Sequence, residues 1–266
     1  MLCQFTVKNF KSIRDEVTFD MQAAAISEHE DRIIIDKDEE KYLPVSAIYG
    51  PNGGGKSNVL AALHTLVAKV LRPLFATEDS EEKVLLQKKI IVEPFVFSES
   101  KDEPTEFELF FRTAVSEYRY ILHVKRDLVL YESLDRVKLE TGRKSALFTR
   151  DENGIVLKGA FAKLKVSDEL SKTLTLLSYL GIAYKGNTVV KDVLSWFEYG
   201  IEFLNYGNPI QELRMAVSTS EEVKQLMLQM IQEMDLDIVD FRVEEKENER
   251  IDIFTKHCVD DVETEI

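Results

Sequence analysis

Eight residues constrain the fold of this chain more than any others. Residues 50–57 read Gly-Pro-Asn-Gly-Gly-Gly-Lys-Ser and match the pattern G-x-x-x-x-G-K-[ST] without mismatch. In this pattern the glycines let the loop curl, so that phosphates can lie against the backbone and successive N–H groups point toward them. A chance match in a chain of 266 residues has a probability on the order of 0.01. The residues predicted to bind the phosphates of a nucleotide are Gly50, Asn52, Gly53, Gly54, Gly55, Lys56, Ser57 and Asn58.

The sequence on both sides of the loop fits this prediction. Residues 44–49 read as a short buried strand, and apolar residues recur at helical spacing over 59–71 until Pro73, which we expect to end the helix. A helix that starts at the end of the loop directs its free N–H groups and its positive dipole end at the phosphates. We expect Lys56 to reach the β and γ phosphates and the Ser57 hydroxyl to be a Mg²⁺ ligand.

The loop and the start of the chain resemble one class of ATPases. Residues 50–60 resemble the Walker A loop of the ABC, SMC and RecF class, of which Asn52-Gly53 and Asn58 are typical. Residues 7–13, Val-Lys-Asn-Phe-Lys-Ser-Ile, resemble the opening strand of that class. The nearest resemblance is to AAA-family ATP-binding proteins of the RecF/OLD-like type, which often occur in bacterial anti-phage and restriction-linked operons.

This resemblance implies a fold, cofactors and partners. The fold would be α/β: the N-terminal portion of a P-loop NTPase head of ABC type, with an antiparallel β subdomain and a helical second half. ATP and Mg²⁺ would be the cofactors, and Lys11 and Ser12 would lie near the adenosine. The implied function is an ATP-driven switch that forms a homodimer through its heads and hydrolyses ATP to ADP and phosphate. The switch would control nucleic-acid processing or an effector protein, a nuclease or a toxin.

Hydrophobic patterning divides the chain into three regions. Residues 1–75 hold the N-terminal strands, the loop and the first helix, residues 76–165 an antiparallel β subdomain, and residues 166–266 a mainly helical region that ends in a β-hairpin. The strands of the subdomain are predicted at 89–97, 107–112, 118–124, 128–134 and 145–150. The later helices are predicted at 170–180, at 189–197 and from 218 onward, and the hairpin at 239–245 and 250–256. The apolar stripe of the last helix, which includes Leu226 and Met230, is interpreted as core rather than as a pliable contact surface.

Hydrolysis needs further groups that the sequence does not present in recognisable form. A second carboxylate near magnesium and a group that positions water are required. In the resembled class they come from a Walker B strand, which ends in Asp-Glu, and from later motifs that include a signature loop. The nearest segments, 33–36, 238–240 and 251–254, are short and lack the acidic pair. Gln87 and Glu93 lie near a strand after which the class often has a glutamine, and neither is assigned a role.

This gap leaves two questions open. Either the chain is part of a longer protein, which we favour, or a second polypeptide completes the site. The function is either that of an ATPase or that of a non-hydrolysing nucleotide-sensing scaffold that recruits a nuclease or toxin.

Charge and composition bear on partners and location. The chain has 34 Lys and Arg against 48 Asp and Glu, a net charge of −14, which repels nucleic acid from the molecule as a whole. Residues 119–165 have 11 basic and 6 acidic residues, so DNA is a possible partner there, although solvated strand edges are the favoured interpretation. Two cysteines fit a reducing compartment. No apolar run approaches the ~18 to 20 residues that span a bilayer. We therefore expect a cytoplasmic protein that does not bind membranes.

Overall fold

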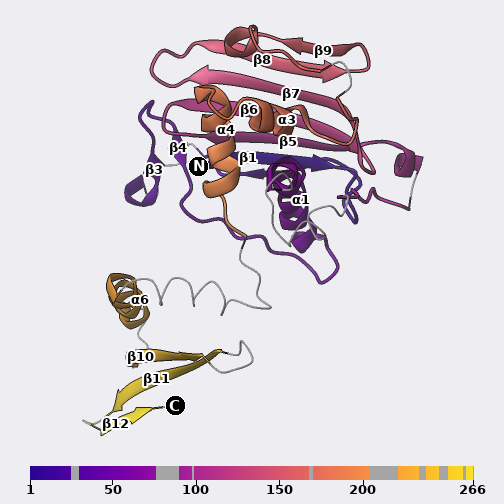
Figure 1. The fold of residues 1–266 in the computed structure, drawn as a ribbon. Helices are drawn as coiled ribbons and strands as arrows, with labels where there is room; N and C mark the ends of the chain where they lie inside the picture. The colour runs from indigo at the N-terminus through magenta and orange to yellow at the C-terminus, as the bar shows by residue number, and fades with distance from the viewer. Residues whose placement is uncertain are drawn as a thin grey trace. The chain divides into compact units, whose positions relative to one another are not determined.

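The computed structural model has a mixed α/β fold, as the sequence predicts (Figure 1). The chain forms two compact units, Met1–Glu202 and Phe203–Ile266. The residues that the structure describes are 1–24, 30–75, 90–97, 99–167, 170–203, 221–233, 238–245, 251–259 and 262–265.

A seven-stranded antiparallel sheet forms the base of the first unit, in the order β2-β1-β5-β6-β7-β8-β9. Its strands are β1 (Leu2–Lys8), β2 (Val17–Asp20), β5 (Thr105–Arg112), β6 (Ser116–Lys125), β7 (Leu128–Lys138), β8 (Lys144–Asp151) and β9 (Gly154–Leu157). The predicted strands at 107–112, 118–124, 128–134 and 145–150 are confirmed, whereas β9 was not predicted. Because β1 pairs with β5, the N-terminal strands and the middle region share one sheet. The expected region boundaries at 75 and 165 fall inside the first unit.

Three helices cover one face of this sheet (Figure 1). They are α1 (Lys56–Phe75), α3 (Leu176–Ala183) and α4 (Thr188–Tyr199). The strands alternate between core and solvent, so that Tyr118, Tyr120 and Leu122 on β6 are all fully buried. On β5, the ring of Phe111 stacks on Trp196 of α4 with ring centroids 4.5 Å apart. The core of the unit therefore lies between the sheet and these helices.

Two predicted helix boundaries are wrong. The helix α1 continues past Pro73 to Phe75, because a proline in the last turn removes one donor and disturbs only the end of the helix. The helix α3 begins at Leu176 rather than at residue 170, because Thr175 is its N-cap and accepts a hydrogen bond from the Ser178 N–H.

The helix α1 is also longer and more apolar than we expect from the sequence. By length and composition alone it is long and apolar enough to cross a membrane, which corrects the expectation that no apolar stretch approaches that length. Its apolar side is nevertheless occupied within the unit, because it packs against β1, α3 and α4. The buried apolar residues of this side are Val59, Ala62, Leu63, Leu66, Val67 and Val70.

Residues 44–49 do not form the predicted buried strand. They follow a short hairpin, β3 (Ile34–Ile35) and β4 (Lys41–Tyr42), and the side chains of Val45 and Tyr49 are 78% and 89% exposed. No strand among the described residues pairs with this segment, so its backbone has no ladder to join. The strand predicted at 89–97 is also absent from its described part, where only Val92 forms a bridge, to Arg126.

The second unit contains one helix and a small sheet within its described residues. The helix is α6 (Glu221–Glu233), and the antiparallel strands are β10 (Ile238–Glu245), β11 (Ile251–Val259) and β12 (Val262–Glu265). The predicted hairpin is thus confirmed, while residues 218–220, where the last helix was expected to begin, lie outside the described residues. The core interpretation of the apolar stripe is wrong for Leu226 and Met230, which are exposed by more than half, whereas Leu228 is buried.

Candidate nucleotide site

The glycine loop of residues 50–57 curls tightly and leads directly into α1. Gly53 and Gly55 have φ angles of 79° and 88°, in the left-handed region that favours glycine. At Gly54 a Cβ atom would lie 3.0 Å from the carbonyl oxygen of Pro51. The Gly54 N–H donates to that same oxygen at 3.1 Å. The loop therefore has a shape that depends on glycine, as the motif predicts.

Lys56 folds back over this loop. Its ammonium group donates to the carbonyl oxygens of Gly50 and Pro51 at 2.7 and 2.8 Å. An ammonium group in this position can exchange neutral carbonyl partners for charged phosphate oxygens, which form stronger hydrogen bonds. The first turn of α1 contains no acidic residue, so the positive end of the helix dipole is not offset by a local carboxylate.

A turn from the start of the chain lies against the loop. The side-chain amide of Asn58 donates to the Ser12 hydroxyl at 2.7 Å, and a Cβ atom on Gly55 would lie 3.0 Å from the same oxygen. The neighbouring Lys11 is exposed, and its ammonium lies 5.5 Å from the centroid of the Phe10 ring. The structure thus brings the residues expected near the adenosine, Lys11 and Ser12, together with the glycine loop.

The far half of α1 is held from two directions. The buried ammonium of Lys69 donates to the carbonyl oxygen of Asp127, in the turn between β6 and β7, at 2.8 Å. The Ser178 hydroxyl, in the first turn of α3, donates to the Val70 carbonyl oxygen at 2.7 Å. The helix that carries Lys56 and Ser57 is therefore bonded both to the sheet and to α3.

A buried carboxylate holds α3 in turn. Glu132 on β7 has no exposed surface, and its carboxylate accepts hydrogen bonds from the N–H groups of Leu176 and Leu177 and from the Tyr120 hydroxyl. Burial raises the pKa of Glu132 despite these three donors. Sequence patterns do not single out this residue, because a single Glu in a strand usually faces solvent.

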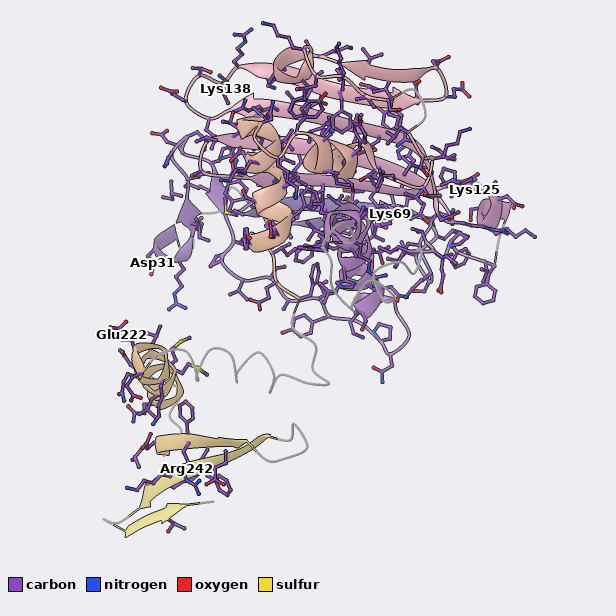
Figure 2. All side chains as sticks on the ribbon, in the orientation of Figure 1. Asp31, Lys69, Lys125, Lys138, Glu222 and Arg242 are labelled. Atoms are coloured by element: carbon purple, nitrogen blue, oxygen red, sulfur yellow. The ribbon has the colours of Figure 1, made fainter. Side chains whose placement is uncertain are left out.

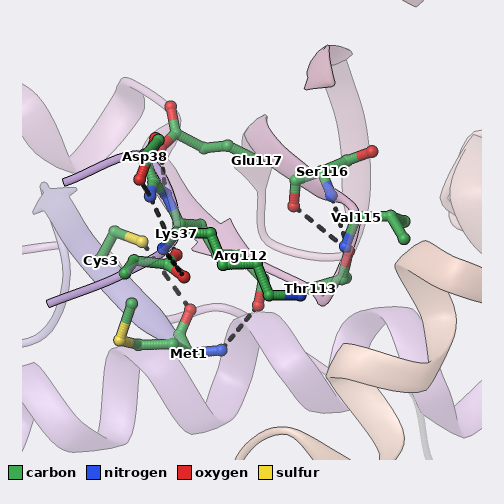
Figure 3. A network of polar contacts seen from close by, with 10 residues as sticks. Met1, Cys3, Lys37, Asp38, Arg112, Thr113, Val115, Ser116 and Glu117 are labelled. Carbon is green, nitrogen blue, oxygen red and sulfur yellow. Dashed lines mark hydrogen bonds and ion pairs between the residues drawn. The ribbon is translucent and has the colours of Figure 1, made fainter. Parts of the chain in front are cut away.

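Arg112 joins the segment before the loop to the sheet (Figure 3). Its guanidinium donates to Asp36 at 3.0 Å, to Asp38 at 2.6 Å and to Glu117 at 2.7 Å, and it lies over the Tyr42 ring. Burial alone would lower the pKa of Arg112, but the three carboxylates raise it above its usual range. Asp36 is the acidic residue of segment 33–36, one of the segments compared with a Walker B strand. It is therefore engaged in an ion pair with Arg112.

The other residues considered for hydrolysis are Asp240, the segment 251–254, Gln87 and Glu93, and none of them is seen to contact the glycine loop among the described residues. Asp240 lies 3.1 Å from the ammonium of Lys224, which lowers the Asp240 pKa. Residues 251–254 belong to β11, and Gln87 lies outside the described residues. Glu93 contributes its backbone oxygen to the Lys11 N–H. Within the described part of the chain, no three His, Cys, Asp or Glu side chains are grouped so that they could hold a metal ion.

The basic residues of the stretch 119–165 are spread over both ends of the sheet. Lys125 lies beside the β6–β7 turn, and Lys138 lies at the opposite end of the sheet, where it pairs with Ser116 (Figure 2). Arg119 forms an ion pair with Glu108. Arg150 is buried, where it donates to backbone oxygens. These positions favour the interpretation of solvated strand edges over a continuous phosphate-binding surface.

One protein family matches most of the chain. The family is described as "AAA domain, putative AbiEii toxin, Type IV TA system", and its model matches residues 45–250. The match includes the whole glycine loop, α1 and the sheet strands that follow. No curated protein matches the chain.

Proposed function

The chain belongs to this AAA domain family, and from that premise we propose that it binds ATP with Mg²⁺ at the loop of residues 50–57. The observation that carries the proposal is the form of the loop. Gly53 and Gly55 adopt left-handed backbone angles, and the Lys56 ammonium already lies across the loop on two carbonyl oxygens.

Each residue of the loop has a role in this proposal. Lys56 leaves the two carbonyl oxygens and neutralises the β and γ phosphates, while the backbone from Asn52 to Gly55 surrounds the phosphate chain. The Ser57 hydroxyl, at the exposed start of α1, holds Mg²⁺, which reduces the negative charge of the phosphates when it is bound. Mg²⁺ keeps several waters and also binds the phosphates of its substrate, so Ser57 would be one ligand among these. Lys11 and Ser12 form the adenosine side.

We further propose that ATP binding drives a switch of the ABC/SMC/RecF-like kind. In this switch two copies associate head to head around nucleotide, in the cytoplasm, and the hydrolysis of ATP to ADP and phosphate separates them. The family description names a putative toxin and a type IV TA system, which supports an output that acts through a toxin; an action on nucleic acid or in anti-phage defence is part of the proposal on the family resemblance alone. Direct binding of DNA by the chain is less well supported than the other outputs, because the basic side chains of residues 119–165 are spread over both ends of the sheet.

The second candidate is a nucleotide-sensing scaffold that binds ATP, does not hydrolyse it, and recruits a nuclease or toxin. The engagement of Asp36 by Arg112 and of Asp240 by Lys224 favours it, because neither carboxylate is free to assist magnesium. The two candidates agree on ATP binding and differ in turnover.

Binding of ATP to the purified chain, with and without Mg²⁺, tests the shared part of the proposal. We expect saturable binding that weakens by about tenfold or more when Mg²⁺ is removed by a chelator. In Ser57→Ala the affinity in Mg²⁺ should fall to that of the chelated wild type, and the chelator should then have no further effect. Binding that is equal with and without Mg²⁺ in the wild type would contradict the role of Ser57.

A further inference from the structure

Asn9 is a buried polar residue at the end of β1 that the proposed site does not use directly. It has no exposed surface and a φ of 57°, a left-handed conformation that asparagine tolerates better than most residues. Its side-chain amide nitrogen lies 2.7, 3.1 and 3.2 Å from the carbonyl oxygens of Ser100, Glu103 and Pro104. Its side-chain oxygen accepts from the Phe95 N–H at 3.0 Å. One side chain thus joins the end of β1 to residues 95–104.

The backbone of Asn9 is held as firmly as its side chain. The Thr105 hydroxyl donates to the Asn9 carbonyl oxygen at 2.6 Å. The Asn9 N–H donates to the Arg14 carbonyl oxygen at 3.2 Å. This last bond closes a tight turn, inside which Phe10 and Ile13 exchange backbone hydrogen bonds at 2.8 and 2.7 Å. Asn9 is therefore the fixed base of the turn of residues 9–14.

The tip of this turn reaches the glycine loop. Ser12 at the tip accepts the hydrogen bond from Asn58 and lies against Gly55. Lys11 at the tip also has a left-handed φ, of 48°, and its N–H donates to Glu93 at 2.9 Å. Two non-glycine residues in left-handed conformations within one short turn persist only where surrounding contacts impose them. Asn9 makes most of these contacts at the base of the turn, and Lys11 makes one at the tip, to Glu93.

We propose that Asn9 is a positioning residue for ATP binding, which holds the Lys11–Ser12 tip against Gly55 and Asn58 without touching the nucleotide. This inference rests on the proposed function. It makes the affinity of the loop for ATP depend on the buried amide of Asn9 and, through its hydrogen bonds, on Phe95, Ser100 and residues 103–105. Burial of Phe10 and Ile13 in the core does not by itself require a fixed tip, whereas contact of the tip with Gly55 and Asn58 does.

The test is a double-mutant cycle between Asn9 and Ser12. Asn9→Gly removes the side-chain hydrogen bonds and keeps a residue that accepts a positive φ. We expect ATP affinity to fall by about tenfold in Asn9→Gly, and most of this loss to disappear in the Ser12→Ala background, because Asn9 acts through the tip. Thr105→Val, which removes only the hydroxyl bond to Asn9, is a milder variant and should show a smaller loss with the same dependence on Ser12.

Ser116→Ala is the matched control for simple destabilisation. Ser116 is fully buried and accepts a hydrogen bond from Arg136, at the other end of the same sheet. Its substitution should lower the melting temperature and leave ATP affinity unchanged. A general loss of stability predicts instead that affinity falls in step with melting temperature in all three variants, which would overturn the inference.

The remaining outcomes separate this inference from the proposed function. If the wild type binds ATP, Lys56→Ala does not, and both Asn9→Gly and Thr105→Val bind as the wild type does, the inference about Asn9 fails alone. If the losses in Asn9→Gly and Ser12→Ala simply add, Asn9 does not act through the tip and the inference also fails. If the wild-type chain does not bind ATP at all, the proposed function fails and this inference fails with it.

Discussion

The side-chain amide of Asn58 donates a hydrogen bond to the Ser12 hydroxyl at 2.7 Å, across 46 residues of sequence. Asn58 belongs to the first turn of α1, and Ser12 belongs to the turn that follows β1. The bond therefore connects the two segments in which the sequence carries its family resemblance. It gives a physical reason for their occurrence in one chain, because each segment forms one side of the same site.

Gly55 should tolerate no side chain. Gly55→Ala combines a φ of 88° with a Cβ atom 3.0 Å from the Ser12 oxygen, so either the loop or the N-terminal turn must move. We expect a loss of about 1–3 kcal/mol in the free energy of unfolding and a loss of ATP binding. Urea denaturation and calorimetric titration with ATP measure the two effects.

Gly142→Ala is the matched control for this substitution. Gly142 has a φ of 62° and open space around its Cβ position, so its substitution should cost about 1 kcal/mol and leave ATP binding intact. Equal ATP binding by the Gly55 and Gly142 variants would contradict the close approach at the loop.

Glu132 should make the stability of the fold depend on pH in an unusual direction. Burial raises its folded-state pKa above the ordinary value of 4.5, so the native state retains a proton that the unfolded chain loses. The contribution is fully present below the unfolded pKa and is lost as pH rises through the folded pKa.

We expect the free energy of unfolding of the wild type, relative to that of Glu132→Gln, to decrease over this window and then to level off. Urea denaturation of both proteins at a series of pH values measures this difference in the free energy of unfolding. A constant difference at all pH values would show that Glu132 does not titrate differently in the folded state.

Arg112 should be a major source of stability for the segment before the loop. Arg112→Met leaves three carboxylates without their shared cation. Because Asp36, Asp38 and Glu117 are 22%, 31% and 25% exposed, we expect a loss of about 2–3 kcal/mol, below that of a fully buried pair. Arg14→Met breaks the exposed ion pair with Asp15 and should change the free energy of unfolding, measured by urea denaturation, only slightly. Similar small effects for both would refute a structural role for the Arg112 cluster.

The parts of the fold that sequence patterns predicted are those fixed by local chemistry. The glycine loop and α1 follow from a motif and a helical apolar stripe, and the strands from β5 to β8 follow from alternating burial. The buried strand predicted at 44–49 failed because its apolar residues alone do not supply a neighbouring strand, and none of the described strands pairs with it.

The polar contacts that organise the site were beyond sequence reasoning for a related reason. Asn9 contacts backbone atoms about 90 residues away, and a pattern in the sequence does not show which distant carbonyl groups an amide will meet. Lys11 and Ser12 were identified only through the family resemblance. Asn9 also lies in the segment that carries the resemblance, and asparagine is among the few residues that adopt a left-handed conformation easily, but neither signal shows what its side chain contacts.

ATP hydrolysis by residues 1–266 tests whether these residues carry all the groups that turnover needs. As Asp36 and Asp240 are both paired within their own units, we expect residues 1–266 to hydrolyse ATP no faster than their Lys56→Ala variant. Phosphate release measured at saturating ATP and Mg²⁺ checks this expectation. Turnover that exceeds this background would identify the chain as a complete ATPase and exclude the scaffold.

Calorimetric titration of Lys56→Ala with ATP and Mg²⁺ tests the central claim most directly. The Lys56 ammonium donates to two carbonyl oxygens of its own loop, at the surface of the unit, so its removal should leave the melting temperature close to that of the wild type. Affinity for ATP should fall by about a hundredfold or more, because a charge-assisted contact to phosphate is lost. The exposed Lys138→Ala variant, at the far end of the β7 strand, should bind as the wild type does. Unchanged affinity in a folded Lys56→Ala protein would contradict the assignment of this loop as the ATP site.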